Sequence, residues 1–220
     1  MAEFTLYIGN KAYSSWSLRG WLACKAAGIA FDEVVVPMNR PESPAAFAKV
    51  SPTRKVPTLD HNGQRIWESI AIAEYLAEIR PQAGLWPADR AARAHARTIS
   101  AEMHAGFTDL RRNMWMNTRR KFPGKGRTPE ALADIARIQE MWRDCRQRYG
   151  AGGPYLFGKF TLADCMYAPV VARFVTWEPE IDATTHAYVE AVWNHHFMLE
   201  WRRAADAEPW VIEKYETAGS

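Results

Sequence analysis

The amino-acid sequence predicts a two-domain α+β fold, in which a small module of strands and helices precedes an all-helical module. Apolar runs with the two-residue period of strands, together with an Asn-Gly turn signal, lie in the first 80 residues. Beyond about residue 91 we find no convincing strand pattern, and long segments rich in Ala, Arg, Glu and Met follow. We therefore predict domains at 1–80 and 91–220, joined by a linker at 81–90 that contains two prolines and a glycine.

The chain begins with a pattern typical of a βαβ unit. Residues 4–8 alternate between apolar and polar side chains, which predicts a strand that stops at Gly9. Helical spacing begins at about Trp16, and Gly28 closes that segment as a C-cap glycine would. The β-branched run at 31–36 then predicts a second strand.

The rest of the first module predicts a hairpin and a helix that packs on it. A short helical piece at 44–49 comes first, and strands at 56–60 and 64–68 then flank an Asn-Gly turn. Residues 70–79 carry an apolar stripe at helical spacing. The predicted order of the first module is β-α-β-(α)-β-β-α.

The second module is predicted to consist of helices at 90–118, 129–149, 162–177 and 184–206. Thr128 followed by Pro129 is a typical helix start. Thr161 and Asp164 have the spacing of a capping box, so we interpret Asp164 as a structural residue and not a catalytic one.

Composition limits the partners, the compartment and the metal sites that we expect for this protein. The net charge of +3 arises from 28 basic and 25 acidic residues, which gives no strong argument for a nucleic-acid or membrane partner. The three cysteines have no metal-ligand spacing and predict a reducing, cytoplasmic setting, and the histidines show no ligand motif either. We see neither an export signal nor an uncharged run long enough to span a membrane. We expect a soluble cytoplasmic protein without a metal site.

Two motifs in the first module resemble the glutathione S-transferase family, and the similarity extends over nearly the whole chain. They are R-K-V-P-T-L at 54–59 and E-S-I-A-I-A-E-Y-L at 68–76. The resemblance implies a thioredoxin-like first domain with a cis bond before the motif proline, next to a valine backbone that pairs with glutathione. The implied glutathione-binding residues of these motifs are Lys55, Val56, Pro57, Glu68 and Ser69.

The Glu-Ser pair also has a physical rationale of its own. A serine and the free N–H groups at a helix start can receive a carboxylate, and Glu68 can pair with an α-ammonium group. The alternative is that Glu68 and Ser69 only cap the helix.

The stretch Tyr-Ser-Ser-Trp-Ser-Leu-Arg at 13–19 resembles the Ser-Ser-Cys-x-x-Arg signature of the zeta-like branch of this family. Ser14, Ser15 and Arg19 match that signature, whereas Trp16 stands where it has cysteine. A thiol with a pKa of about 8.5 is mostly protonated at neutral pH, so a hydroxyl donor helps to form the thiolate.

The resemblance assigns this catalytic role to Ser14. Ser15 either contacts the same corner or caps the helix, and Ser17 is expected inside the first helical turn. Arg19 either contributes to an electropositive site or forms a structural ion pair.

The second substrate is expected on the helical module. Its predicted contacts are Trp16, Arg111, Met114 and Trp115. Met114, Trp115 and the neighbouring Met116 could equally belong to the core. The basic residues between 109 and 127 form either a solvated surface or a field that attracts an anionic substrate.

These observations predict a glutathione transferase that joins glutathione, its cosubstrate, to an electrophilic small molecule, as in detoxification. The first alternative is a glutathione-dependent isomerase of the zeta-like type. A noncatalytic binding protein on the same fold is another alternative. Thiol-disulfide reduction ranks last because the nearest cysteine, Cys24, lies about two turns into a predicted helix. The resemblance further implies a homodimer.

Overall fold

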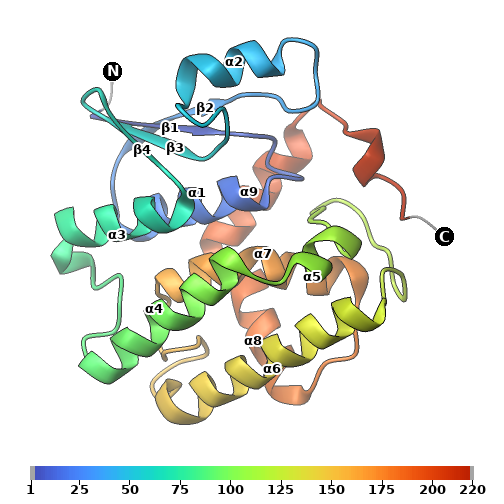
Figure 1. Cartoon of the computed structure of the whole chain (residues 1–220). Coiled ribbons are helices and arrows are strands. Elements are labelled where there is room, and N and C mark those ends of the chain that lie inside the picture. The colour runs from blue at the N-terminus through green and yellow to red at the C-terminus, as the bar shows by residue number, and fades with distance from the viewer. Residues whose placement is uncertain (1–2, 219–220) are drawn as a thin grey trace.

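The computed structural model describes residues 3–218, and Figure 1 shows a small sheet with its helices above a group of longer helices. The first module has the predicted order of elements. Its strands and helices are β1 (Phe4–Ile8), α1 (Ser15–Ala26), β2 (Phe31–Val35), α2 (Ser43–Val50), β3 (Thr58–His61), β4 (Gln64–Trp67) and α3 (Ser69–Ile79).

The four strands form one mixed sheet in the order β2-β1-β3-β4. β1 runs parallel to β2 and antiparallel to β3, with Leu6 opposite Leu59 in the register. The predicted hairpin joins β3 to β4 through Asn62 and Gly63, which both adopt positive φ angles. The apolar positions of β1 are buried, as their alternation predicts, and α1 and α3 lie on the side of the sheet that faces the long helices (Figure 1).

The second module is helical throughout its regular elements. A short 3-10 turn at Pro81–Ala83 precedes it, and another lies at Glu213–Tyr215 near the end of the described chain. The helices are α4 (Arg90–Ala105), α5 (Thr108–Asn113), α6 (Pro129–Tyr149), α7 (Leu162–Trp177), α8 (Ala183–Trp193) and α9 (His196–Ala207). The two-domain α+β class is therefore confirmed.

Two of the predicted helices are interrupted. The segment predicted as one helix at 90–118 breaks at Gly106, and Phe107 adopts a left-handed conformation before α5 begins. The segment at 184–206 breaks after Trp193, where Asn194 ends α8 and the His195 side chain caps α9. Both breaks leave the spacing of apolar residues nearly helical, so periodicity alone does not reveal them.

Helix α7 forms the centre of the molecule. Fifteen of its sixteen residues are buried, and α1 from the first module packs directly against it. One continuous apolar core extends from the sheet through α1 and α7 to α6 and α8. The position of α1 is therefore determined by both modules.

The start of α7 is held by the predicted capping box. The buried Asp164 carboxylate accepts hydrogen bonds from Thr161 N at 2.7 Å, Leu156 N at 3.2 Å and the Tyr188 hydroxyl at 3.1 Å. Burial raises the pKa of Asp164 to about 6, although these donors favour the charged form. The residue joins three segments and is structural, as predicted.

We expect Asp164→Ala to lower the free energy of unfolding by about 3 kcal/mol or more, because several buried donors lose their acceptor at once. Urea unfolding followed by circular dichroism measures this. Asp206→Ala removes an exposed carboxylate from α9 and should change stability by less than about 0.5 kcal/mol. Equal losses in the two variants would contradict the structural role of Asp164.

Candidate functional site

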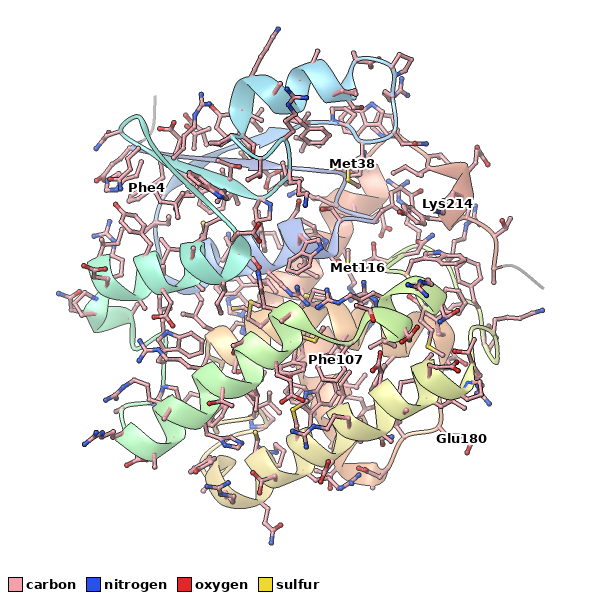
Figure 2. The ribbon with its side chains drawn as sticks, viewed as in Figure 1. Phe4, Met38, Phe107, Met116, Glu180 and Lys214 are labelled. Carbon is pink, nitrogen blue, oxygen red and sulfur yellow. The ribbon has the colours of Figure 1, made fainter. Side chains whose placement is uncertain are left out.

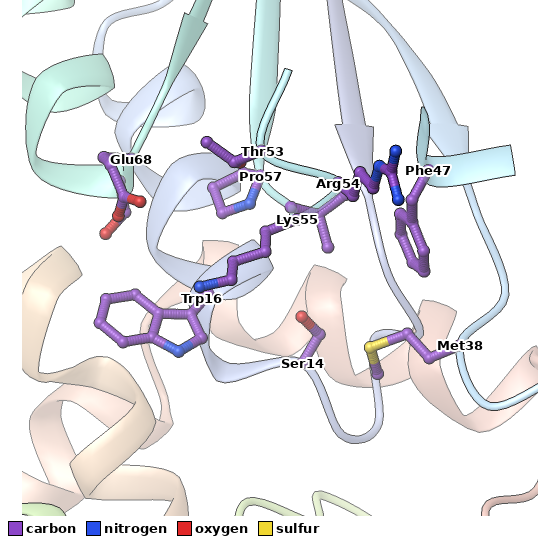
Figure 3. Close-up of a pocket in the computed structure, with 11 residues that line it drawn as sticks. Ser14, Trp16, Met38, Phe47, Thr53, Arg54, Lys55, Pro57 and Glu68 are labelled. Carbon is purple, nitrogen blue, oxygen red and sulfur yellow. The ribbon is translucent and has the colours of Figure 1, made fainter. Parts of the chain in front are cut away.

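A pocket of about 350 Å³ lies where the start of α1, the loop before β3 and the start of α3 converge (Figure 3). Its walls come from both ends of the first module. The lining residues are Ser14, Trp16, Met38, Phe47, Thr53, Arg54, Lys55, Val56, Pro57, Glu68 and Ser69.

Most residues predicted to bind glutathione meet in this pocket. Ser14 and all five predicted residues of the two motifs line it, although 55 positions separate Ser14 from Ser69. Ser15 is buried at the same corner but does not line the pocket. Sequence reasoning missed Met38, Phe47, Thr53 and Arg54, although Arg54 is the first residue of the 54–59 motif and Thr53 adjoins it.

Ser14 occupies the N-cap of α1, so the alternative that Ser15 is the cap is wrong. The Ser14 hydroxyl donates to Ser17 Oγ at 2.7 Å, and Ser17 Oγ accepts from Gly9 N at 2.9 Å. Ser17 is completely buried in the first turn, as predicted. In Figure 3 the Ser14 oxygen points toward the centre of the pocket, next to the positive end of the helix dipole.

The Val56–Pro57 peptide bond is cis, as the resemblance implies. Pro57 is buried against Gly20 of α1, and a methyl group at Gly20 would lie 2.8 Å from Pro57 Cγ. Because that distance is too short for two carbon atoms, glycine is required for α1 to approach the motif so closely. The same helix therefore positions Ser14 and supports the loop opposite it.

The start of α3 contains two unusual features. Glu68 has a φ of +67°, a conformation that non-glycine residues rarely adopt. Ser69 is 1% exposed, and its hydroxyl has no partner among residues 3–218. Neither side chain caps α3, so the alternative that the pair serves only as a cap is not supported.

The predicted second-substrate contacts separate in the structure. Trp16 lines the pocket, with the Arg19 guanidinium 4.4 Å and the Arg111 guanidinium 4.8 Å from its ring centre. Arg111 itself lies behind Trp16, where its side chain donates to the carbonyl oxygens of Gly106 and Met103. Arg111 therefore does not line the pocket.

Met114 and Trp115 do not line the pocket either. Met114 and Met116 are buried in the core, where Figure 2 shows Met116 near the middle of the molecule, because the chain leaves the helical conformation after α5 and turns inward. The Trp115 ring packs on the Trp177 ring, with 4.8 Å between the ring centres. Trp115 borders a different cavity, together with residues 124–128. The alternative of core packing is thus correct for both methionines.

Arg19 forms no ion pair with a carboxylate in the described part of the chain. Its Nε donates to the Met166 carbonyl oxygen at 2.9 Å. The structural ion-pair hypothesis is therefore wrong, because the Arg19 side chain is buried and makes no salt bridge with an acid among residues 3–218. Burial, followed by the charges of Arg111 and Arg173, lowers the pKa of Arg19.

The C-terminal segment holds the loop that precedes Ser14. The Glu208 carboxylate accepts from Lys11 N at 2.9 and 3.0 Å, and the Tyr13 hydroxyl donates to Glu216 at 2.6 Å. Several basic residues of the 109–127 segment hold this region in place. Arg119 donates to the Glu208 carbonyl oxygen, and Arg120 pairs with Glu216. Much of that positive charge is therefore used within the fold.

Residues 3–218 contain no cluster of three or more potential metal ligands, and no helix among them is long and apolar enough to cross a bilayer. All three cysteines are free and buried, and burial raises the pKa of the Cys24 thiol. None of them lines the pocket.

Family models match both halves of the chain. Residues 13–79 match the N-terminal domain of glutathione S-transferases, and residues 91–207 match the C-terminal domain of the same family. The chain belongs to the glutathione S-transferase family. The predicted resemblance and the thioredoxin-like first domain are thereby confirmed.

Curated relatives include isomerases and transferases. The maleylacetoacetate isomerase of Rhizobium meliloti (strain 1021) is 30% identical, over 82% of this chain and 86% of that protein. A probable maleylacetoacetate isomerase of Caenorhabditis elegans is 37% identical, over 48% of each chain. Glutathione S-transferase L3 of Arabidopsis thaliana is 26% identical, over 72% of this chain and 62% of that protein. The chain thus spans only half to two thirds of these last two relatives. The isomerases agree with the predicted zeta-like branch.

Solved structures of glutathione transferases have the same fold. A glutathione transferase homologue from Burkholderia GL BGR1, solved with bound glutathione, has a TM-score of 0.69 and 27% identity, with 93% of this chain and 99% of that chain covered. Glutathione transferase Omega 2S from Trametes versicolor has a TM-score of 0.67 and 21% identity, with 95% of this chain and 98% of that chain covered. The second comparison supports the fold alone.

We expect Gly20→Ala to destabilise this glutathione S-transferase family member by about 1–3 kcal/mol, because the added methyl group pushes α1 away from Pro57. Chemical unfolding measures the change. An unhindered Gly→Ala substitution inside a helix would instead stabilise it by about 1 kcal/mol. A gain in stability would show that the contact between α1 and the cis-proline loop is not tight.

Proposed function

We propose that this protein is a glutathione transferase in which the Ser14 hydroxyl stabilises the glutathione thiolate for attack on a small electrophile. The observation that carries this proposal is the convergence of Ser14, the Val56 backbone and Ser69 in one pocket. In this family, such a convergence brings together a thiolate donor, a strand-like partner for a peptide and a helix start that attracts a carboxylate.

The pocket offers complementary groups for the charged ends of glutathione. The unpartnered Ser69 hydroxyl and the first N–H groups of α3 would receive the γ-glutamyl carboxylate, while the adjacent Glu68 would pair with the α-ammonium group. In Figure 3, Lys55 extends across the pocket toward Trp16, where its ammonium would meet the other carboxylate. Val56, in the cis bond, would pair its backbone with the cysteine residue of glutathione.

A chain of hydrogen bonds supports the role of Ser14. Gly9 N donates to Ser17 Oγ, and the two serine hydroxyls share the next hydrogen bond. Because a hydroxyl hydrogen can rotate, Ser17 can donate to Ser14 while Ser14 donates to a thiolate. Donors linked in this way strengthen one another. Ser15, buried behind them, would shape the corner.

The proposed reaction requires a modest electrostatic contribution. Lowering a thiol pKa by about two units requires about 2.7 kcal/mol of preferential stabilisation of the thiolate. A hydroxyl donor to an anion together with the N-terminal end of α1 can supply this amount. The thiol proton leaves to solvent and the sulfur forms a bond to the electrophilic carbon. In a substitution the leaving group departs with the electrons of its bond, and in an addition the displaced electron pair of the substrate takes up a proton from solvent.

The second substrate is proposed to contact the large apolar side chains that line the pocket, which are Trp16 on one side of Ser14 and Met38 and Phe47 on the other (Figure 3). Large apolar side chains of this kind bind small molecules mainly through buried area. Trp16 replaces a smaller signature residue, and its ring therefore reduces the space beside the thiol.

A glutathione-dependent isomerase is the second candidate, and the isomerases among the relatives favour it. Besides the Rhizobium protein, the maleylpyruvate isomerase of Ralstonia sp is 29% identical over 90% of this chain. An isomerase regenerates free glutathione in every turnover, whereas a transferase consumes it. Measuring the loss of free thiol during turnover therefore separates the two activities.

We also propose a twofold dimer and a cytoplasmic location. The dimer follows from membership of the family. The cytoplasmic proposal is supported by three cysteines that are all free, which is in keeping with a reducing compartment.

We expect Ser14→Ala to raise the pKa of the bound glutathione thiol by about 1–2 units, because the thiolate loses a hydrogen bond. Calorimetric titration with glutathione establishes binding, and ultraviolet absorbance of the thiolate across pH gives the pKa. Ser15→Ala, outside the pocket lining, should shift it by less than half as much. Absence of glutathione binding by the wild type would refute the proposed function. Binding without a lowered thiol pKa would instead indicate a noncatalytic binding protein.

We expect Ser69→Ala to weaken glutathione binding by about 10-fold or more, since a buried hydroxyl donor to a carboxylate is lost. Ser100→Ala is the matched control. The Ser100 hydroxyl is also buried without a described partner, but it does not line the pocket. Calorimetry on both variants compares their dissociation constants. Equal affinities would contradict the role proposed for Ser69.

A further inference from the structure

Three arginines from three helices gather behind the pocket. Arg19 lies on α1, Arg111 on α5 and Arg173 on α7. Arg19 is 1% exposed and Arg173 is 4% exposed. The guanidinium groups of Arg19 and Arg111 both lie within 4.8 Å of the Trp16 ring centre, and Arg19 and Arg173 donate to the carbonyl oxygens of Met166 and Pro169, three residues apart on α7. Burial and then the charge of Arg111 lower the pKa of Arg173 to about 9. We call Arg19, Arg111 and Arg173 the arginine cluster.

The arginine cluster is bonded only to neutral backbone oxygens. Arg19 Nε donates to Met166 O, Arg173 Nη1 donates to Pro169 O at 3.0 Å, and Arg111 donates to two backbone carbonyl oxygens. No ion pair joins any of the three to an acid within the described chain. Asp134 acts on Arg111 only at longer range, and its carboxylate accepts a hydrogen bond from Leu110 N.

Four guanidinium nitrogens in the cluster have no hydrogen-bond partner and almost no contact with solvent. They are Nη1 and Nη2 of Arg19, Nη1 of Arg111 and Nε of Arg173. Nδ1 of His104, a neighbour whose pKa is lowered by burial and then by the charge of Arg19, also lacks a partner. Buried donors are normally paired, and buried charges even more so.

Trp16 separates the arginine cluster from the pocket. Its ring borders the pocket and also contacts the guanidinium groups of Arg19 and Arg111. The electron-rich face of the ring offsets part of their charge. One ring shared by two cations leaves most of the positive charge without compensation.

We propose that the arginine cluster binds one small monovalent anion, either a halide or a single carboxylate group, that enters from the pocket when the Trp16 ring shifts. An arginine keeps its proton under ordinary conditions, so an anion is the remaining way to compensate the cluster. The unpartnered nitrogens can donate the hydrogen bonds that the anion loses when it leaves its hydration shell. Their enclosure admits only a small one. This inference does not depend on glutathione binding.

Thermal unfolding of the full chain tests the proposal in three potassium salts at equal ionic strength. Chloride probes a free inorganic ion, formate probes the carboxylate group of a larger ligand, and gluconate is too bulky to enter. At an anion concentration ten times its dissociation constant, the favoured anion should raise Tm by about 3–6 °C relative to gluconate. A rise in either chloride or formate supports the site and identifies the source. Equal Tm values in all three salts overturn it.

Arg19→Met and Arg173→Met should each abolish this dependence on the anion. Arg112→Met is the matched control, since it removes the same charge from an exposed side chain on α5 next to Arg111. It should keep the full dependence. If Arg112→Met lost as much of the dependence of Tm on the anion as Arg19→Met, the effect would be general screening of charge, and the proposal would be overturned.

Direct binding gives a readout that does not require the variants to fold. Where chloride raises Tm, chlorine NMR of the wild-type protein should show chloride line broadening that gluconate does not reverse. Unfolding the protein with urea should remove the broadening. Broadening that persists at the same size in the unfolded chain would contradict an internal site.

Discussion

The packing of α1 against α7 is the contact on which both the fold and the site depend. Helix α1 follows the first strand, carries Ser14 at its start and meets Pro57 through Gly20. Its opposite side joins the nearly completely buried α7. Because one apolar core runs through both modules, the corner that holds Ser14 cannot move without disturbing the helical domain.

The pocket itself is built from local backbone features that would be costly without tertiary support. Glu68, with its positive φ angle, and Ser69, with its unpartnered hydroxyl, both border the same 350 Å³ space. Strained conformations and unsatisfied donors persist where the surrounding structure holds them, and they tend to occur at functional sites. Their concentration in a glutathione S-transferase fold supports a single ligand site.

Sequence reasoning succeeded where a short motif carries its own geometry. The Asn-Gly hairpin, the capping box at Asp164 and the motif around Val56 are each contained in a few consecutive residues. It left Met114 between the pocket and the core, and the structure buries this side chain in the core after α5 ends. It also did not detect Met38 and Phe47, which reach the pocket from segments that have no recognisable pattern.

The sequence by itself determined the class of fold, the family and the residues of the glutathione motifs, because turn chemistry, strand alternation and capping act over a few neighbouring positions. Only the tertiary structure decided which side chains face the pocket and which lie behind it. Arg19 illustrates this: its place in a signature suggested either a site residue or an ion pair, whereas packing buried it beside Arg111 and Arg173. Burial and proximity arise from contacts between helices distant in the chain, and no local pattern records them.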